Sequence, residues 1–81
     1  MADGHKSAVP DLDHIFRYHS PTADQQGKYV ALRDAAKAFA QAIVDNTPPS
    51  ADQAAAIRLV REAVMTANAS IALGGRLTKE G

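Results

Sequence analysis

Apolar residues recur at helical spacing in two long segments of the chain, residues 22–46 and residues 51–73. In both segments the spacing alternates between three and four residues. The first segment carries Tyr29, Leu32, Ala36, Phe39 and Ile43. The second segment carries Ile57, Val60, Val64, Ala67 and Ile71. This spacing aligns the side chains along one face of a helix, so the pattern predicts two amphipathic helices.

Both predicted helices begin at a residue suited to capping. Thr22 is followed three residues later by Gln25, and Ser50 by Gln53. A hydroxyl followed by Gln at this distance is typical of a capping box, in which each side chain binds the other residue's backbone N–H. The helix starts are therefore predicted near residues 22 and 50.

Both predicted helices also end at residues that disfavour continuation. Pro48 and Pro49 follow the first helix, and Gly74 and Gly75 follow the second. Proline cannot continue a helix, and glycine readily takes the left-handed conformation of a C-terminal cap. Because the connection between the helices is short, we predict an all-α fold built on an antiparallel two-helix hairpin.

The remaining segments are short. We expect residues 1–15 to form a flexible or partly helical arm, disordered over residues 1–9. Pro10 can start a helical turn over residues 11–16, and a flexible arm is the alternative. The hairpin domain is then residues 16–76, with a tail at residues 77–81.

The predicted hairpin carries apolar residues beyond those that align along one face of each helix. Further small or apolar residues lie on second lines, namely Leu59, Ala63, Thr66, Ser70 and Leu73, with Val30, Ala40 and Val44 on the first helix. About a fifth of the residues are alanine, well above ordinary usage. Alanine is also simply a good helix former. Two apolar faces on one hairpin nevertheless favour a homo-oligomer.

Composition supports self-association. A chain of 81 residues buries little surface unaided and usually needs disulfides, a metal or a partner subunit. The sequence has no cysteine. His14 and His19 are five residues apart, which is not the spacing that places two metal ligands on one helix face. We therefore expect no metal and no cofactor. Of the three sources of stability, this leaves a partner subunit.

The charge balance restricts the partners. There are 9 basic and 9 acidic residues, whereas duplex binding normally needs a basic excess, so we expect no DNA partner. A small phosphorylated ligand needs only two or three local cations. No apolar run approaches the ~20 residues of a membrane span, and residues 1–10 contain no apolar stretch. We expect no membrane contact and a cytoplasmic location.

Catalytic motifs are absent from the sequence. It contains no nucleophile elbow, P-loop, dinucleotide fingerprint or His-Glu zinc helix. Asp11 and Asp13 lie in the arm, where we expect mobility. A small interior offers little support for groups that must be held accurately. We therefore expect a protein that is not an enzyme.

Aromatic and basic residues concentrate around the start of the first helix. All the Phe and Tyr residues except Phe39 lie here, and the candidate ligand-binding residues are Phe16, Tyr18, His19, Lys28, Tyr29 and Arg33. Rings stack on nucleobases, and Lys and Arg bind phosphates. In the alternative interpretation, Phe16 and Tyr29 fill the core and the cations are solvated.

Asn68 is unusual in the middle of a predicted helix, where asparagine is disfavoured. Its amide can recognise a ligand or a neighbouring helix, or it can face water.

Two stretches of the chain resemble one known family. Residues 16–33 (FRYHSPTADQQGKYVALR) and residues 47–50 with 61–72 (TPPS, REAVMTANASIA) resemble the phage anti-CBASS and Thoeris anti-defence hairpin family. The chain departs from the family pattern at Thr66, where we expect an aromatic residue. A stacking role is therefore not assigned to Thr66.

The resemblance implies a sponge. Such proteins bind cyclic oligonucleotide or cyclic ADP-ribose-type immune signals in the cytoplasm of the infected bacterial host and sequester them without cleavage. They resemble hexamers assembled from hairpin dimers, with pockets between subunits. The partners implied are cyclic di- or trinucleotide second messengers and further copies of the chain.

The resemblance also implies roles for individual residues. By matching position, Tyr18 stacks on a base and Lys28 holds a phosphate, with Phe16, His19, Tyr29 and Arg33 completing or supporting the pocket. Met65 and Asn68 line it from the partner helix. Arg76 is a candidate for a second phosphate contact, or else a free cation at a helix C-terminus.

Two rival functions stay open. A structural helical assembly protein needs only the apolar faces and tolerates mutation of Tyr18 and Lys28. A host-protein-binding adaptor instead presents a helix face to its partner and exposes an apolar patch.

Overall fold

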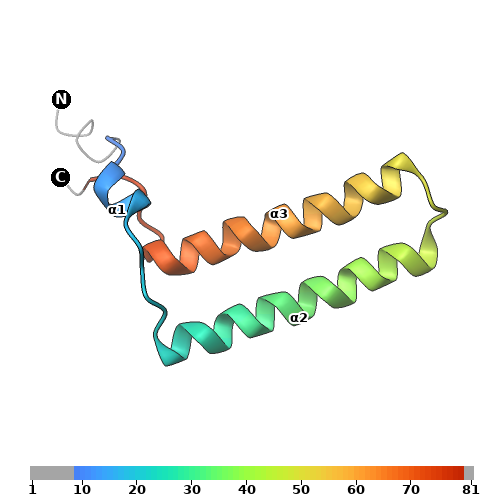
Figure 1. Ribbon diagram of the computed structural model, residues 1–81, viewed down its shortest axis with the longest axis horizontal. Coiled ribbons are helices and arrows are strands. Elements are labelled where there is room, and N and C mark those ends of the chain that lie inside the picture. Colours follow the sequence, from blue (N-terminus) through green and yellow to red (C-terminus); the bar gives the residue numbers. More distant parts are fainter. Residues whose placement is uncertain (1–8, 80–81) are drawn as a thin grey trace.

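A computed structural model describes residues 9–79 of the chain as three helices (Figure 1). They are α1 (Leu12–Phe16), α2 (Ala23–Asn46) and α3 (Ala51–Leu73). Within these residues there is no strand, only an isolated antiparallel bridge between Pro10 and Thr78. The predicted all-α fold and both long helices are confirmed. The sequence predicts disorder over residues 1–9. Of these residues the structure describes only Val9, and the others lie outside the described residues.

Local capping sets where α2 and α3 begin. The Thr22 hydroxyl accepts from the Gln25 N–H at 3.1 Å, and the Thr22 N–H donates to the Gln25 amide oxygen at 3.0 Å. The Ser50 hydroxyl accepts from the Gln53 N–H at 3.1 Å. The Gln53 amide, however, donates to the carbonyl and hydroxyl oxygens of Thr47, and its oxygen does not accept from the Ser50 N–H. The first capping box is therefore complete, and the second is only half formed.

Two glycines end α3. Gly74 and Gly75 have φ angles of 65° and 76°, in the left-handed region that glycine adopts without strain. The Gly74 N–H donates to the Ile71 carbonyl at 3.2 Å, and the Gly75 N–H donates to the Ser70 carbonyl at 2.9 Å. This pair of bonds is a Schellman motif, so the predicted stop at the glycine pair is confirmed.

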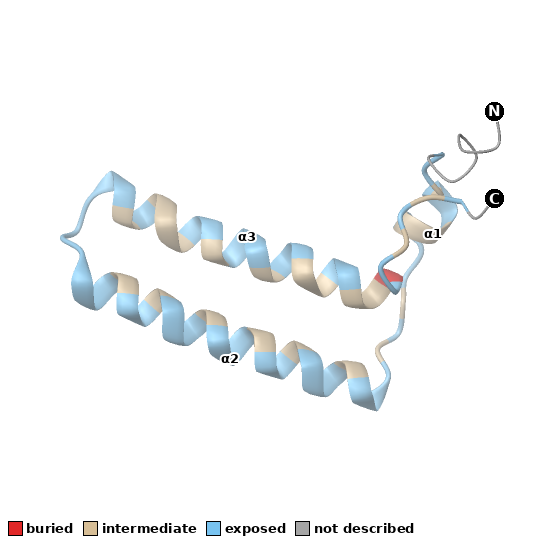
Figure 2. Ribbon diagram, turned by 180° about the vertical axis from the view of Figure 1, so that it is seen from behind, coloured by how far each residue is buried: buried red, intermediate tan, exposed pale blue. Residues whose placement is uncertain are grey.

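Helices α2 and α3 pack along their length and bury little. Figure 2 shows half-buried positions on the facing sides of α2 and α3 and exposed positions on their outer sides. Among the described residues only Leu73 is buried, at 9% exposure, and Phe39 from the predicted α2 stripe is 60% exposed. The two stripes therefore face each other without closing a core.

The short helix α1 lies at the end of the hairpin opposite the loop between α2 and α3 (Figure 1). The chain directly before α1 is fastened to the segment after α3. The Asp11 N–H donates to the Leu77 carbonyl at 3.0 Å, and the Lys79 N–H donates to the Val9 carbonyl at 2.7 Å. The arm is thus bound to the hairpin end and, from Leu12 to Phe16, helical.

Candidate functional site

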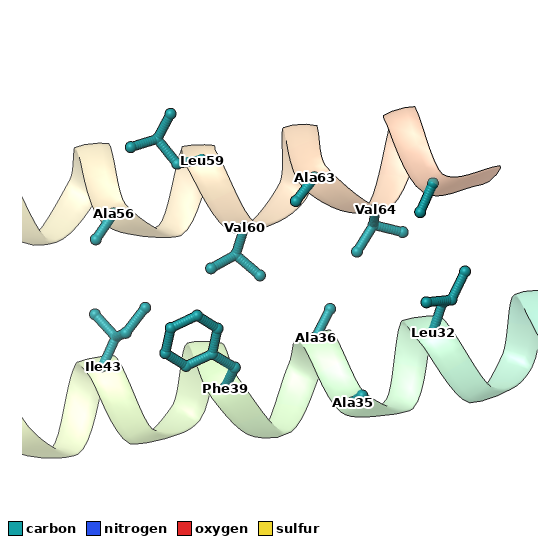
Figure 3. A pocket seen from close by; sticks show the side chains of 11 residues that line it. Leu32, Ala35, Ala36, Phe39, Ile43, Ala56, Leu59, Val60, Ala63 and Val64 are labelled. Carbon is teal, nitrogen blue, oxygen red and sulfur yellow. The ribbon is translucent and has the colours of Figure 1, made fainter. Parts of the chain in front are cut away.

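An apolar groove of about 580 Å³ runs between α2 and α3. Figure 3 shows Phe39 and Ile43 on α2 and Val60 and Val64 on α3 directed toward the space between the helices. Every residue that lines the groove is apolar: Leu32, Ala35, Ala36, Phe39, Ile43, Ala56, Leu59, Val60, Ala63, Val64 and Ala67. A groove without a polar side chain offers little to fix a phosphate or to orient a base. Its chemistry suits another apolar surface.

Two more strongly exposed aromatic residues, Phe16 and Tyr18, lie outside this groove, at the end of the hairpin where α1 lies. Phe16 ends α1 and is 81% exposed, and Tyr18, in the connection to α2, is 82% exposed. Tyr29, in the second turn of α2, is half-buried. The alternative that Phe16 fills the core is therefore wrong for the single chain. Two rings are free to stack on a flat ligand at this end.

The candidate cations on α2 do not converge. The Lys28 ammonium lies 3.2 Å from the Asp24 carboxylate, and both side chains are exposed. Arg33 is also exposed. At 3.6 residues per turn, positions 28 and 33 are separated by about 140° around the helix. The two cations therefore lie on different sides of α2.

On α3, Met65 is exposed and Asn68 is half-buried. The side-chain oxygen of Asn68 is buried and has no hydrogen-bond donor among the described residues. The alternative that Asn68 simply faces water does not hold for this oxygen. A buried acceptor without a donor costs about 1–3 kcal/mol, so Asn68 is suited to a donor from outside the single chain.

Arg76 is not a free cation. Its guanidinium donates to the Asp11 carboxylate at 2.7 Å and to the Thr78 carbonyl at 3.1 Å. The Arg76 guanidinium, and next the His14 backbone N–H, hold the pKa of the Asp11 carboxyl below its ordinary value of 3.8. Sequence reasoning missed this pair because its members are 65 positions apart.

The Asp11–Arg76 pair predicts an acid-sensitive contribution to stability. Because the pKa of Asp11 is lower in the folded protein, the pair stabilises the fold fully above pH 3.8 and is lost as the pH falls through the folded pKa. Urea unfolding should therefore show wild type more stable than Asp11→Asn by a constant margin from pH 7 to about pH 4, and the margin should shrink below that. The same substitution at the exposed neighbour Asp13 is the control. A margin that does not change between pH 7 and pH 3 would contradict the assignment.

Two histidines connect α3, α1 and the segment that carries Tyr18. The His14 Nε2–H donates to the Leu73 carbonyl at 2.9 Å, and the His19 Nε2–H donates to the His14 carbonyl at 2.7 Å. A carbonyl only accepts, so both imidazoles carry a proton on Nε2. Their rings meet edge to face, with centroids 4.9 Å apart. We call His14, His19 and the Leu73 carbonyl the histidine clasp.

Sequence reasoning considered His14 only as a metal ligand. Among residues 9–79 the structure has no group of three or more His, Cys, Asp or Glu placed to hold a metal ion. Both Nε2 atoms are instead used in hydrogen bonds. The sequence contained little indication of this role, because the role of His14 depends on where α3 ends in space.

The described residues 9–79 contain no candidate membrane span. None of the three helices there has the length and apolar character that a membrane span requires.

Comparison with known proteins identifies the family. A family model described as the Acb2/Tad1 hairpin domain matches residues 9–72, which contain α1, α2 and nearly all of α3. No curated protein and no solved structure matches the chain. The matched span covers most of the 81 residues and includes the exposed aromatic segment. The chain therefore belongs to the Acb2/Tad1 hairpin family, the anti-CBASS and anti-Thoeris sponges, which is a binding family rather than an enzyme family.

Proposed function

We propose that this protein is a phage anti-defence sponge that binds a cyclic oligonucleotide or cyclic ADP-ribose-type immune signal and sequesters it intact in the cytoplasm of the infected host. The observation that carries the proposal is the exposure of Tyr18, at 82%, within the span that matches the family. An aromatic ring that fills no interior is suited to stack on a nucleobase. Lys28, ten residues further on, supplies a cation for a phosphate.

The proposed binding site lies between copies of the chain. Lys28 and Arg33 point to different sides of α2, so a pocket that uses both draws on two subunits. The Asn68 oxygen is buried without a donor among residues 9–79, so it is suited to a donor from a ligand or a neighbouring subunit. Phe16, His19, Tyr29, Met65 and Arg76 complete the proposed set, His19 and Arg76 as supports for the surrounding chain.

Self-association is part of the same proposal. Only one described residue is buried, and large apolar side chains are exposed over both long helices. A hairpin with so little interior does not offset the conformational entropy lost on folding unless a partner covers its apolar groove. The partner that is always present is another copy of the chain. The family resemblance implies a hexamer, and light scattering measures the number of subunits.

Sequestration without cleavage rests on the side chains available near Tyr18. The imidazoles of His14 and His19 donate to backbone carbonyls, and Asp24, the first carboxylate of α2, is paired with Lys28. Neither arrangement is typical of an activated nucleophile or a general base poised at a ligand.

The proposal is tested with a panel of cyclic di- and trinucleotides and cyclic ADP-ribose. A bound ligand at 100 times its dissociation constant should stabilise the folded protein by about 2.7 kcal/mol, which is measured as a raised melting temperature. Heating the complex should then release a ligand of unchanged mass and chromatographic retention. Hydrolysed or linear nucleotide in the released fraction would contradict sequestration, and no shift with any member of the panel would contradict nucleotide binding.

One observation favours a second candidate function. The apolar groove accounts for a purely structural helical assembly, or for an adaptor that binds a host protein, with no ligand at all. In either case Tyr18 and Lys28 should be neutral to mutation.

A further inference from the structure

The segment that carries Tyr18 is held in place by its neighbours rather than by Tyr18 itself. Residues 17–22 connect α1 to α2 and contain no helix. The Tyr18 side chain is almost fully exposed, so it is not anchored by packing. His19, the next residue, donates a hydrogen bond back to the His14 carbonyl at 2.7 Å. The backbone around Tyr18 is therefore restrained from its carboxyl side.

The restraint extends to the end of the hairpin. His14 donates from its ring to the carbonyl of Leu73, the last residue of α3 and the one buried residue among those described. The His14 backbone N–H also donates to Asp11 at 3.2 Å, and Asp11 accepts from Arg76 at 2.7 Å. A continuous set of hydrogen bonds thus runs from the segment after α3, through α1, to the residue beside Tyr18.

We infer that the histidine clasp is a positioning device that holds Tyr18 in the conformation required for ligand binding, with His14 as its central residue. The part of this inference that concerns ligand affinity rests on the proposed function. The part that concerns how the segment is held does not. A segment in the binding-competent conformation for only a fraction of the time lowers the apparent affinity by that fraction. If loss of the clasp reduces that fraction to about a tenth, the apparent affinity falls about tenfold.

Trypsin cleavage after Arg17 tests the clasp without any ligand. Arg17 is exposed and directly precedes Tyr18, so release of this segment should expose the bond between them to the protease. His14→Ala should be cut there at least several times faster than wild type. His14→Gln should be cut at close to the wild-type rate, because its side-chain amide can still donate to the Leu73 carbonyl. Asp13→Ala, at an exposed position of α1, is the matched control.

Mass spectrometry of the cleavage products separates local release from unfolding. Lys37 and Arg58 lie within α2 and α3, where global unfolding would expose them as well. The clasp predicts faster cutting at Arg17 with unchanged protection at those two positions. Equal cutting of wild type and His14→Ala at Arg17 would overturn the inference, as would simultaneous cutting at all three positions.

A double-mutant cycle tests the ligand-binding half, with cyclic di-AMP and cyclic ADP-ribose as the probes. His14→Ala should weaken binding about tenfold in the wild-type background and by less than twofold in the Tyr18→Ala background, because it acts through Tyr18. A loss of equal size in both backgrounds would overturn the positioning role. If neither these probes nor any other member of the cyclic nucleotide panel binds the wild type, the proposed function and this half of the inference fail together, while the cleavage pattern still decides whether the clasp holds the segment.

Discussion

Ala63→Glu is expected to dissociate the assembled protein and reduce its helix content. Ala63 lies on α3 in the lining of the apolar groove. It is exposed in the single chain, where a surface substitution normally changes stability by no more than about 0.5 kcal/mol. If a second copy covers the groove, the same change buries an unpaired carboxylate at a cost of about 3–5 kcal/mol. That is a large share of the stability of a small domain.

The matched control for this change is Ala54→Glu. Positions 54 and 63 are both exposed alanines within α3, and nine residues place them about 180° apart around the helix. The two variants therefore have the same change in helix propensity and in charge. Light scattering and circular dichroism should show a lower mass and a weaker helical signal for Ala63→Glu only. An unchanged mass for Ala63→Glu would show that the groove is not the surface on which copies meet.

Tyr18→Ala and Lys28→Ala are each expected to weaken ligand binding roughly ten- to hundredfold. Tyr18→Ala removes a base-stacking contact of about 1–3 kcal/mol. Lys28→Ala removes a charge-assisted phosphate contact of about 1.5–3 kcal/mol. Neither residue lines the groove, so neither change should alter the mass of the assembly. Calorimetric titration measures the affinity, and light scattering measures the mass on the same samples.

Two control variants test whether the effect is specific to the Tyr18 ring and to the position of Lys28. Tyr18→Phe keeps the ring and should retain most of the affinity. Lys37→Ala removes the other lysine of α2 and should leave binding unchanged. Unchanged affinity in both Tyr18→Ala and Lys28→Ala would move the site elsewhere and favour the structural assembly function. Lost affinity together with lost mass would make these residues supports of the interface instead.

The two sets of variants examine different surfaces of one molecule. The groove variants test a face made only of apolar side chains, whereas the Tyr18 and Lys28 variants test the polar and aromatic end near α1. If the site is shared between subunits, Ala63→Glu should also lose ligand affinity, whereas Tyr18→Ala should leave the assembly intact. This one-way dependence follows from a site that is complete only in the oligomer.

The sequence by itself determined the positions and types of the two long helices. The first capping box joins Thr22 to Gln25, and the C-terminal cap joins Gly74 and Gly75 to the last turn of α3. Each of these features involves residues within about five positions of one another. Local backbone chemistry therefore decides them before any long-range packing takes place.

The sequence also contained the separation of Lys28 and Arg33, although closeness along the chain suggested one cluster. Five residues of helix are enough to turn the two side chains to different sides, and this follows from helical geometry alone. Treating residues 16–33 as one site therefore combined groups that a single subunit holds apart. The exposed aromatic residues are consistent with that site, and the cations divide between the sides of α2.

The tertiary structure alone decided how the arm is held. Asp11 meets Arg76 across 65 positions, and His14 meets the Leu73 carbonyl across 59. Such contacts depend on the loop after α2 returning the chain so that the end of α3 lies beside α1, and no local pattern encodes that placement. The same return leaves the Asn68 oxygen buried without a donor in the part of the chain that the structure describes. The two long helices followed from interactions between residues close in sequence. The restraint of the segment that carries Tyr18 and the unpaired Asn68 oxygen depend instead on how residues far apart in sequence come together in space.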